Sequence, residues 1–230
     1  MQHLLLLHGA IGASAQLRPL ADSLSARYDV LAPDLVGHGG RALDGAPFSV
    51  QLFADDILRY IEDKKIGQVS VFGYSMGGYV GMYLAKHHPE KIAKVITLAT
   101  KYHWDEATAQ KETQMLNPEK MEQKIPAFAA TLRGRHHPND WKEVLNRTAE
   151  MMTALGKDNT FKTEDYASIS IPALLLLGDR DKMVTLEETA AVYRVLPNAQ
   201  MALLPGTPHP IEQIDNELLT FIVERFLAQP

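Results

Sequence analysis

Short apolar runs alternate along the chain with longer segments in which apolar residues recur every three or four positions. The run at residues 3–7 shows no alternation, which predicts a strand buried on both faces, because a strand with one wet face would alternate polar and apolar residues. The expected strands are residues 3–7, 29–33, 68–72, 94–99, 173–177 and 201–204. The segments of helical spacing are residues 14–28, 49–66, 75–87, 186–196 and 211–228. This alternation predicts an α/β fold, with about six mainly parallel strands flanked by helices.

Residues 101–170 interrupt the pattern, because they contain no convincing strand and carry helix signals instead. We therefore expect residues 1–100 and 171–230 to form the α/β core, and residues 101–170 to form an inserted helical lid. The alternative is a surface excursion that has no role in function.

Local signals predict where the helices of this insert begin and end. Asn117 followed by Pro118 is a start signal, since an N-cap residue precedes a proline at the first helical position. Pro126 should kink or break the helix that contains it. A further helix is expected over residues 138–155, with Gly156 ending it.

Composition excludes some classes of function and some kinds of site, but it does not identify the function. The 230 residues are 46% hydrophobic and 22% charged, as in ordinary globular proteins. The formal net charge of −5 argues against a general nucleic-acid binder, which would be basic. The chain has no cysteine, so disulfides, thiolate nucleophiles and cysteine-based zinc sites are excluded.

The amino-terminal apolar run is too short for the core of a signal peptide and lacks a basic segment before it. No segment approaches the roughly 20 apolar residues that a membrane-spanning helix needs. We therefore expect a cytoplasmic protein with no membrane partner.

The sequence G-Y-S-M-G at residues 73–77 is the strongest chemical signal. It lies between a predicted buried strand and a predicted helix, which is the setting of the nucleophile elbow G-x-S-x-G. Small residues on either side let the backbone turn sharply, and the helix amino terminus favours negative charge at Ser75. The pattern predicts Ser75 as a nucleophile, and the alternative is a tight turn without chemistry.

Three other strand ends carry residues that complete this chemistry. His8-Gly9-Ala10 follows the first strand, where an amide can join the amide after the nucleophile in an oxyanion hole. The expected donors are the amides of Ala10 and Met76. Taken alone, His-Gly after a strand is only a turn.

A base and an acid are expected after the last two strands. His209 is the only histidine late in the chain, and it follows the sixth strand. Asp179 and Asp181 both follow the fifth strand, and either could orient the base, although turn aspartates are common. The chain order of serine, acid and histidine is the order expected of a nucleophile-elbow hydrolase.

The remaining candidates concern the substrate pocket and metals. His103 and Trp104 open the predicted lid and could line a pocket or simply pack, and Phe128 and Met151 are apolar lid residues that could also line it. Paired histidines at residues 136–137 invite a metal interpretation, but no carboxylate at ligand spacing supports it. We expect no metal.

Taken together, these motifs resemble those of the α/β-hydrolase superfamily, specifically its serine hydrolases and esterase-like members. The resemblance rests on L-L-H-G at residues 6–9, D-L-V-G-H-G at 34–39, the elbow at 73–77 and G-x-x-D at 178–181. It covers nearly the whole chain outside the predicted lid. In the family's G-x-x-D pattern the last aspartate is the acid of the triad, which implies that Asp181 has this role.

This chain departs from the family pattern in two ways. It begins at the His-Gly strand and lacks the β-hairpin that usually precedes it. The residues after His209 also lack the usual spacing to a later acidic residue. The motifs therefore do not assign the chain to a subfamily.

The resemblance implies a hydrolase that cleaves a carboxylic ester or related acyl bond of a small to medium substrate through an acyl-enzyme, without a cofactor. Serine at the elbow argues against the dehalogenases and epoxide hydrolases of the family, which use aspartate there. C–C bond hydrolases, acyltransferases, lyases and cofactor-free haloperoxidases share the triad and stay open. A low-turnover ligand-binding receptor and a structural interaction module stay open as well. The natural substrate and the oligomeric state are not predicted.

Overall fold

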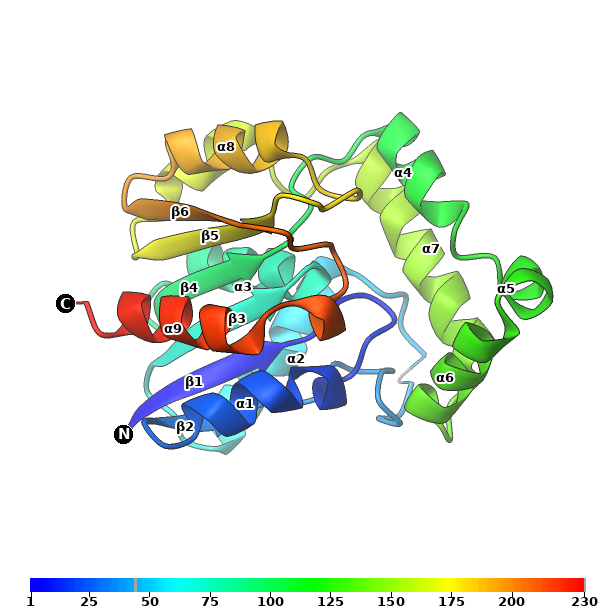
Figure 1. The fold of residues 1–230 in the computed structure, drawn as a ribbon, viewed down its shortest axis with the longest axis horizontal. Helices are drawn as coiled ribbons and strands as arrows, with labels where there is room; N and C mark the ends of the chain where they lie inside the picture. Colours follow the sequence, from blue (N-terminus) through cyan, green and yellow to red (C-terminus); the bar gives the residue numbers. More distant parts are fainter. Residues whose placement is uncertain (44, 230) are drawn as a thin grey trace.

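A single six-stranded sheet organises the computed structural model, which describes residues 1–43 and 45–229. Every strand pairing is parallel, and the order across the sheet is β2-β1-β3-β4-β5-β6 (Figure 1). The strands are β1 (Gln2–Leu7), β2 (Tyr28–Leu31), β3 (Val69–Tyr74), β4 (Ile92–Leu98), β5 (Ala173–Gly178) and β6 (Ala199–Leu204). The predicted α/β fold with six parallel strands is confirmed.

Helices cover both faces of the sheet, as is usual for a parallel sheet. One face carries α1 (Arg18–Leu24) and α9 (Asn216–Leu227) (Figure 1). The other face carries α2 (Val50–Asp63), α3 (Met76–His87) and α8 (Leu186–Val195). Because successive side chains of a strand point to opposite faces, β1 contributes two leucines to each of the two cores.

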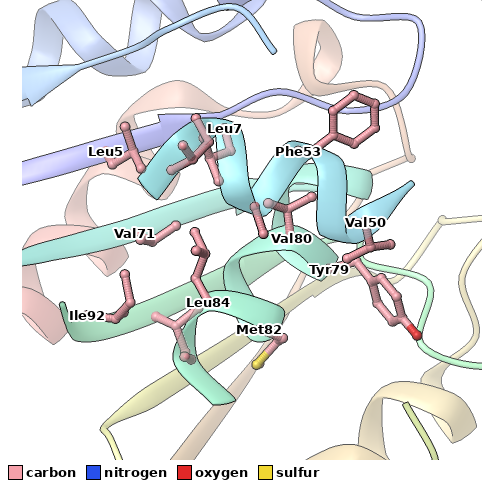
Figure 2. Close-up of a cluster of buried hydrophobic side chains, with 14 of the residues drawn as sticks. Leu5, Leu7, Val50, Phe53, Val71, Tyr79, Val80, Met82, Leu84 and Ile92 are labelled. Carbon is pink, nitrogen blue, oxygen red and sulfur yellow. The ribbon is translucent and has the colours of Figure 1, made fainter. Parts of the chain in front are cut away.

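The core beneath α2 and α3 fixes the geometry at the end of β3. Figure 2 shows Leu5, Leu7 and Val71 of the sheet together with Val80 and Leu84 of α3. These side chains are fully buried. Since β3 and α3 are packed into the same core, the short turn that joins them is held on both sides.

Two of the predicted helices are each interrupted near their amino-terminal end. The segment predicted at residues 14–28 forms a 3₁₀ helix, η1 (Ser14–Leu17), followed by α1, whose first turn contains proline, and the helix ends at Leu24 because Tyr28 already belongs to β2. Residues 211–228 form η3 (Ile211–Gln213) and then α9. The second break arises because Asp215 caps α9, where its carboxylate accepts hydrogen bonds from the amides of Glu217 and Leu218.

Between β4 and β5 the chain forms a group of helices at the edge of the sheet where the strands end (Figure 1). We call α4 to α7 the α4–α7 segment: α4 (Glu106–Thr113), α5 (Pro118–Lys124), α6 (Pro126–His136) and α7 (Trp141–Lys157). It is followed by η2 (Thr163–Ser168). The segment has an apolar cluster of its own, formed by Met121, Ala129, Leu132, Trp141 and Leu145.

Not all of the helix boundaries predicted in this segment agree with the structure. Asn117 caps α5, since its side chain accepts a hydrogen bond from the amide of Lys120, and α6 begins at Pro126. The prediction that Gly156 ends a helix is wrong, because α7 continues to Lys157. Gly156 instead allows close packing of α7 on α4, since a Cβ atom there would lie 2.5 Å from the Cβ of Ala109.

Across residues 1–43 and 45–229, none of the helices combines the length and the apolar character that crossing a bilayer requires.

Candidate active site

Ser75 lies at the turn between β3 and α3 in a strained backbone conformation. Its φ of 51° and ψ of −117° fall outside the regions that L-residues favour. The turn is held because the amide of Ser75 donates to the carbonyl oxygen of Leu98 at 2.8 Å. The hydroxyl of Thr100 donates to the carbonyl oxygen of Ser75 at 3.1 Å. Strain of this kind is typical of residues whose position serves a site.

The glycines of the elbow permit close approach of the backbone. A Cβ atom at Gly77 would lie 2.3 Å from the carbonyl oxygen of Leu7, and one at Gly73 would lie 2.3 Å from that of Gly77. Side-chain atoms do not fit at such distances from backbone atoms. The first turn of α3 therefore lies directly against β1 and β3, and Ser75 is kept at the carboxyl edge of the sheet.

We expect Gly77→Ala to lower the free energy of unfolding by about 2–3 kcal/mol, because the new methyl group would force the backbones of β1 and α3 apart. Urea unfolding followed by circular dichroism measures this change. Gly134→Ala is the matched control, since no described atom lies within 4 Å of a Cβ atom at this position in α6. The control should raise stability by about 0.5–1 kcal/mol. Equal stability of the two variants would contradict the packing argument.

His209 and Asp181 lie together at the ends of β6 and β5. The Nδ1 atom of His209 is 2.8 Å from Oδ2 of Asp181. The other carboxylate oxygen of Asp181 accepts hydrogen bonds from the amides of Met183 and Val184, at 2.8 and 2.9 Å. The side chain of Asp181 is only 1% exposed, so this arrangement is shielded from water.

These contacts determine the charge state of Asp181. Burial by itself raises the pKa of this carboxyl, but the hydrogen bond from His209 and those from the two amides outweigh it, so the pKa lies below its ordinary value. Asp181 is therefore ionised and can hold a proton on Nδ1 of His209. Asp179 does not contact His209; its carboxylate accepts a hydrogen bond from the amide of Thr207 at 3.2 Å.

Ser75 and His209 both border a cavity of about 270 Å³. Most of its surface is apolar, and its apolar lining includes Met115, Leu116, Phe128, Met152 and Met183. A smaller cavity of about 40 Å³ also borders Ser75, together with Ala10 and Met76. The serine thus has open space on two sides, at the junction between the core and the α4–α7 segment.

Two backbone amides beside Ser75 are available to a ligand. Met76 is the first residue of α3, so its amide has no acceptor within the helix. Among the hydrogen bonds of the described residues, none is donated by the amide of Ala10. Both residues border the smaller cavity together with Ser75.

The predicted pocket residues are not all brought to Ser75. Phe128 borders the larger cavity, and Trp104 and Met151 border the smaller one. His103 instead borders a separate cavity of about 310 Å³, and its side chain is 65% exposed. Its Nε2 atom lies 3.3 Å from the carboxylate of Asp105.

Several polar residues at the larger cavity were not predicted from the sequence. They are Gln16, Glu112, Arg135 and Glu212. The side chain of Arg135 is 14% exposed. Helical spacing in α6 does not reveal which way this arginine points, and no motif marks it, so only the folded chain shows that it reaches the cavity.

The hydrogen bonds of His8 indicate a structural role and not that of a second base. Its Nδ1 atom donates to the carbonyl oxygen of Gly9 at 2.8 Å, and its Nε2 atom accepts from the amide of Leu35 at 3.1 Å. Burial lowers the pKa of His8 to about 4, so the ring is neutral near pH 7. Both nitrogens are occupied, and the ring ties the end of β1 to the loop after β2.

The paired histidines do not form a metal site together. His136 is buried, whereas the neighbouring His137 is exposed. In the part of the chain that the structure describes, no group of three or more histidine, aspartate or glutamate residues is arranged to hold a metal ion.

Comparison with known proteins gives matches along nearly the whole chain. The model of the alpha/beta hydrolase fold family matches residues 2–211. The 2-(acetamidomethylene)succinate hydrolase of Mesorhizobium japonicum is 24% identical, over 97% of this chain and 87% of that protein. The 3-oxoadipate enol-lactonase 2 of Acinetobacter baylyi is 28% identical over 70% of this chain and 65% of that protein. The malate-bound structure of a thermophilic esterase from Thermogutta terrifontis has a TM-score of 0.75 and 25% identity, covering 99% of this chain and 89% of that one.

Proposed function

The chain belongs to the alpha/beta hydrolase fold family, and from this premise we propose that it is a serine hydrolase that cleaves carboxylic esters, lactones included, through an acyl-enzyme on Ser75. One observation carries the proposal. Ser75 borders the same cavity as His209, whose other ring nitrogen is held at 2.8 Å by a buried, ionised carboxylate. A serine, a histidine and a carboxylate in this relation are the parts of an acyl-transfer triad.

Acylation begins when Nε2 of His209 takes the proton of the Ser75 hydroxyl. Asp181 keeps the proton of the ring on Nδ1, so Nε2 is free to act as the base. The serine oxygen attacks the acyl carbon and a tetrahedral intermediate forms. His209 then gives its new proton to the departing alcohol oxygen, and the acyl group stays on Ser75.

The negative oxygen of the intermediate is assigned to the amides of Ala10 and Met76. Their position on the cavity beside Ser75 supports this role. Donors placed in advance stabilise the charge where it develops, without reorganisation during the reaction. The amino terminus of α3 adds a favourable dipole at the same place.

Deacylation repeats these steps with water as the nucleophile. His209 takes a proton from the water, the hydroxide oxygen attacks the acyl carbon, and Ser75 leaves with the proton returned by His209. The products are the carboxylic acid and the regenerated serine. No group beyond the residues of the chain is required for this sequence.

The larger cavity favours a small to medium substrate. Its volume of about 270 Å³ lies near the lower end of the range for small-molecule sites, and its wall is mostly apolar. The names of the enol-lactonase and esterase relatives also support ester or lactone hydrolysis. The position of the α4–α7 segment over the carboxyl ends of the strands supports a role as a lid.

A fluorophosphonate probe tests the proposal directly, because it phosphonylates an activated serine much faster than an ordinary one. We expect one adduct per chain by intact mass, and peptide mapping should locate it on Ser75. Labelling should be blocked by prior incubation with a p-nitrophenyl ester that accumulates as acyl-enzyme. Absence of an adduct on folded protein would contradict the proposal, and saturable binding of acyl compounds without turnover would then favour a ligand-binding receptor.

A further inference from the structure

The loop after β1 meets α6 at one residue, Ile11. This residue has a φ of 50°, in the left-handed region that β-branched residues rarely adopt. The surrounding turn is closed by the amide of Gly12, which donates to the carbonyl oxygen of Gly9 at 3.1 Å. A backbone conformation of this kind persists only where neighbouring contacts enforce it, and here those contacts come from the α4–α7 segment.

Two adjacent side chains of α6 donate hydrogen bonds to the carbonyl oxygen of Ile11. Nη1 of Arg135 and Nε2 of His136 each lie 3.0 Å from this oxygen. A carbonyl oxygen has two lone pairs, so both are occupied. Because α6 is distant in sequence from this loop, both bonds form only when α6 is docked on the core.

His136 is fixed in the state that makes this bond possible. It is fully buried, and its Nδ1 atom accepts a hydrogen bond from the amide of Gly39 at 3.3 Å. A ring that accepts at Nδ1 carries its proton on Nε2, which points at the carbonyl oxygen of Ile11. Burial lowers the pKa of His136, which keeps the ring neutral in this tautomer.

The side chain of Ile11 makes a third connection to the same segment. It packs against the apolar cluster formed by α5, α6 and α7. Ile11 is therefore held by its carbonyl oxygen and by its side chain, and both partners belong to the α4–α7 segment. The preceding residue is Ala10, which borders the cavity beside Ser75 and whose amide donates none of the hydrogen bonds of the described residues.

We propose that Arg135 and His136 are positioning residues, which hold Ile11 in its left-handed conformation and so place the Ala10 amide in the oxyanion hole. The hole is then complete only while α6 is docked on the core. This inference rests on the proposed function, since it takes Ala10 as an oxyanion donor. A donor displaced by about 1 Å loses much of its effect on the transition state and little of its effect on substrate binding.

Substitution of His136 by asparagine or glutamine tests its two hydrogen bonds separately. In His136→Asn the amide oxygen can replace Nδ1 and accept from Gly39, but the side chain is too short to reach Ile11. In His136→Gln the amide nitrogen can replace Nε2 and restore the bond to Ile11. The matched control is His137→Asn, the same exchange at the exposed neighbour.

Steady-state hydrolysis of p-nitrophenyl acetate gives the first readout. We expect His136→Asn to lower kcat by about 10- to 100-fold, which is less than the loss of a whole oxyanion donor, with KM changed by less than about threefold. His136→Gln should recover most of the lost kcat, and His137→Asn should match the wild type. Thermal unfolding checks that each variant is folded. An unchanged kcat in folded His136→Asn, or a loss equal in the Asn and Gln variants, would overturn the inference.

A second readout does not depend on activity. In a ¹H–¹⁵N correlation spectrum the amide signal of Ala10 should move in His136→Asn, return toward its original position in His136→Gln, and stay in place in His137→Asn. Arg135→Met should move it as well, and Arg135→Lys less so. If Ser75 resists fluorophosphonate but the Ala10 signal follows this pattern, the proposed function fails while the loop coupling stands. If Ser75 is labelled and the signal does not move, only the coupling fails.

Discussion

Ser75→Ala is expected to lower kcat/KM for an ester substrate by at least about 10⁴-fold, and to abolish fluorophosphonate labelling. The exchange removes the only atom that forms the acyl bond in the proposed reaction. The residual rate would come from water activated by His209 and from the oxyanion donors. Because alanine keeps the backbone amide and carbonyl that hold the turn, the fold should be retained.

Hydrolysis of p-nitrophenyl esters and intact-mass labelling measure the effect, and circular dichroism checks the fold. Ser23→Ala is a suitable control, because Ser23 is exposed in α1 and borders neither cavity beside Ser75. Its hydroxyl donates to the carbonyl oxygen of Pro19 and accepts from the side-chain amide of Asn216. It should leave both activity and labelling unchanged. Ester hydrolysis that survives in Ser75→Ala at more than about a tenth of the wild-type rate would exclude Ser75 as the nucleophile.

Asp181→Asn should lower kcat by about 10³- to 10⁴-fold at neutral pH with little loss of stability. The amide oxygen of asparagine can still accept the hydrogen bonds from Met183 and Val184. Its NH₂ group would then face Nδ1 of His209 and donate to it. Nδ1 would lose its proton to Nε2, and a protonated Nε2 cannot accept the proton of Ser75.

Asp179→Asn is the matched control for this prediction, because the same exchange occurs two residues away at an aspartate that does not contact His209. Its kcat should stay within about threefold of the wild type. Comparison of pH–rate profiles gives a further check, since loss of the carboxylate should shift the acid limb as well as lower the plateau. A larger loss in Asp179→Asn than in Asp181→Asn would reverse the assignment of the acid.

The sequence predicts the fold because short apolar runs alternate with segments of helical spacing, which indicates parallel strands with helices on both faces of the sheet. Once the strands are parallel, their carboxyl ends lie at one edge of the sheet, and the loops just beyond those ends can bring their residues together there. This is why Ser75, Asp181 and His209 can be grouped without a structure. The preference for Asp181 over Asp179 comes from the family resemblance, and the contact with His209 provides a physical reason for it.

What the sequence does not predict depends on long-range packing. Nothing in the local pattern indicates that Ile11 is left-handed, because the donors that enforce this conformation belong to α6. The position of Arg135 at the larger cavity and that of His103 at a separate cavity also follow from how the α4–α7 segment packs on the core. Gly156 resembles a helix stop in the sequence because its close contact with α4 leaves no local signature.

The α4–α7 segment leaves the sheet after β4 and returns at β5, and these two strands are hydrogen-bonded neighbours. The sheet therefore closes in the same way whatever is inserted there, and doubling the length of such an insert adds only about 0.6 kcal/mol of closure entropy. The insert could therefore be exchanged between related proteins, which would change the pocket while leaving Ser75, Asp181 and His209 on the core. A transplanted insert would have to bring its own donors to the carbonyl oxygen of Ile11, and also to the carbonyl oxygens of Gly37 and Arg41, which Asn139 binds here.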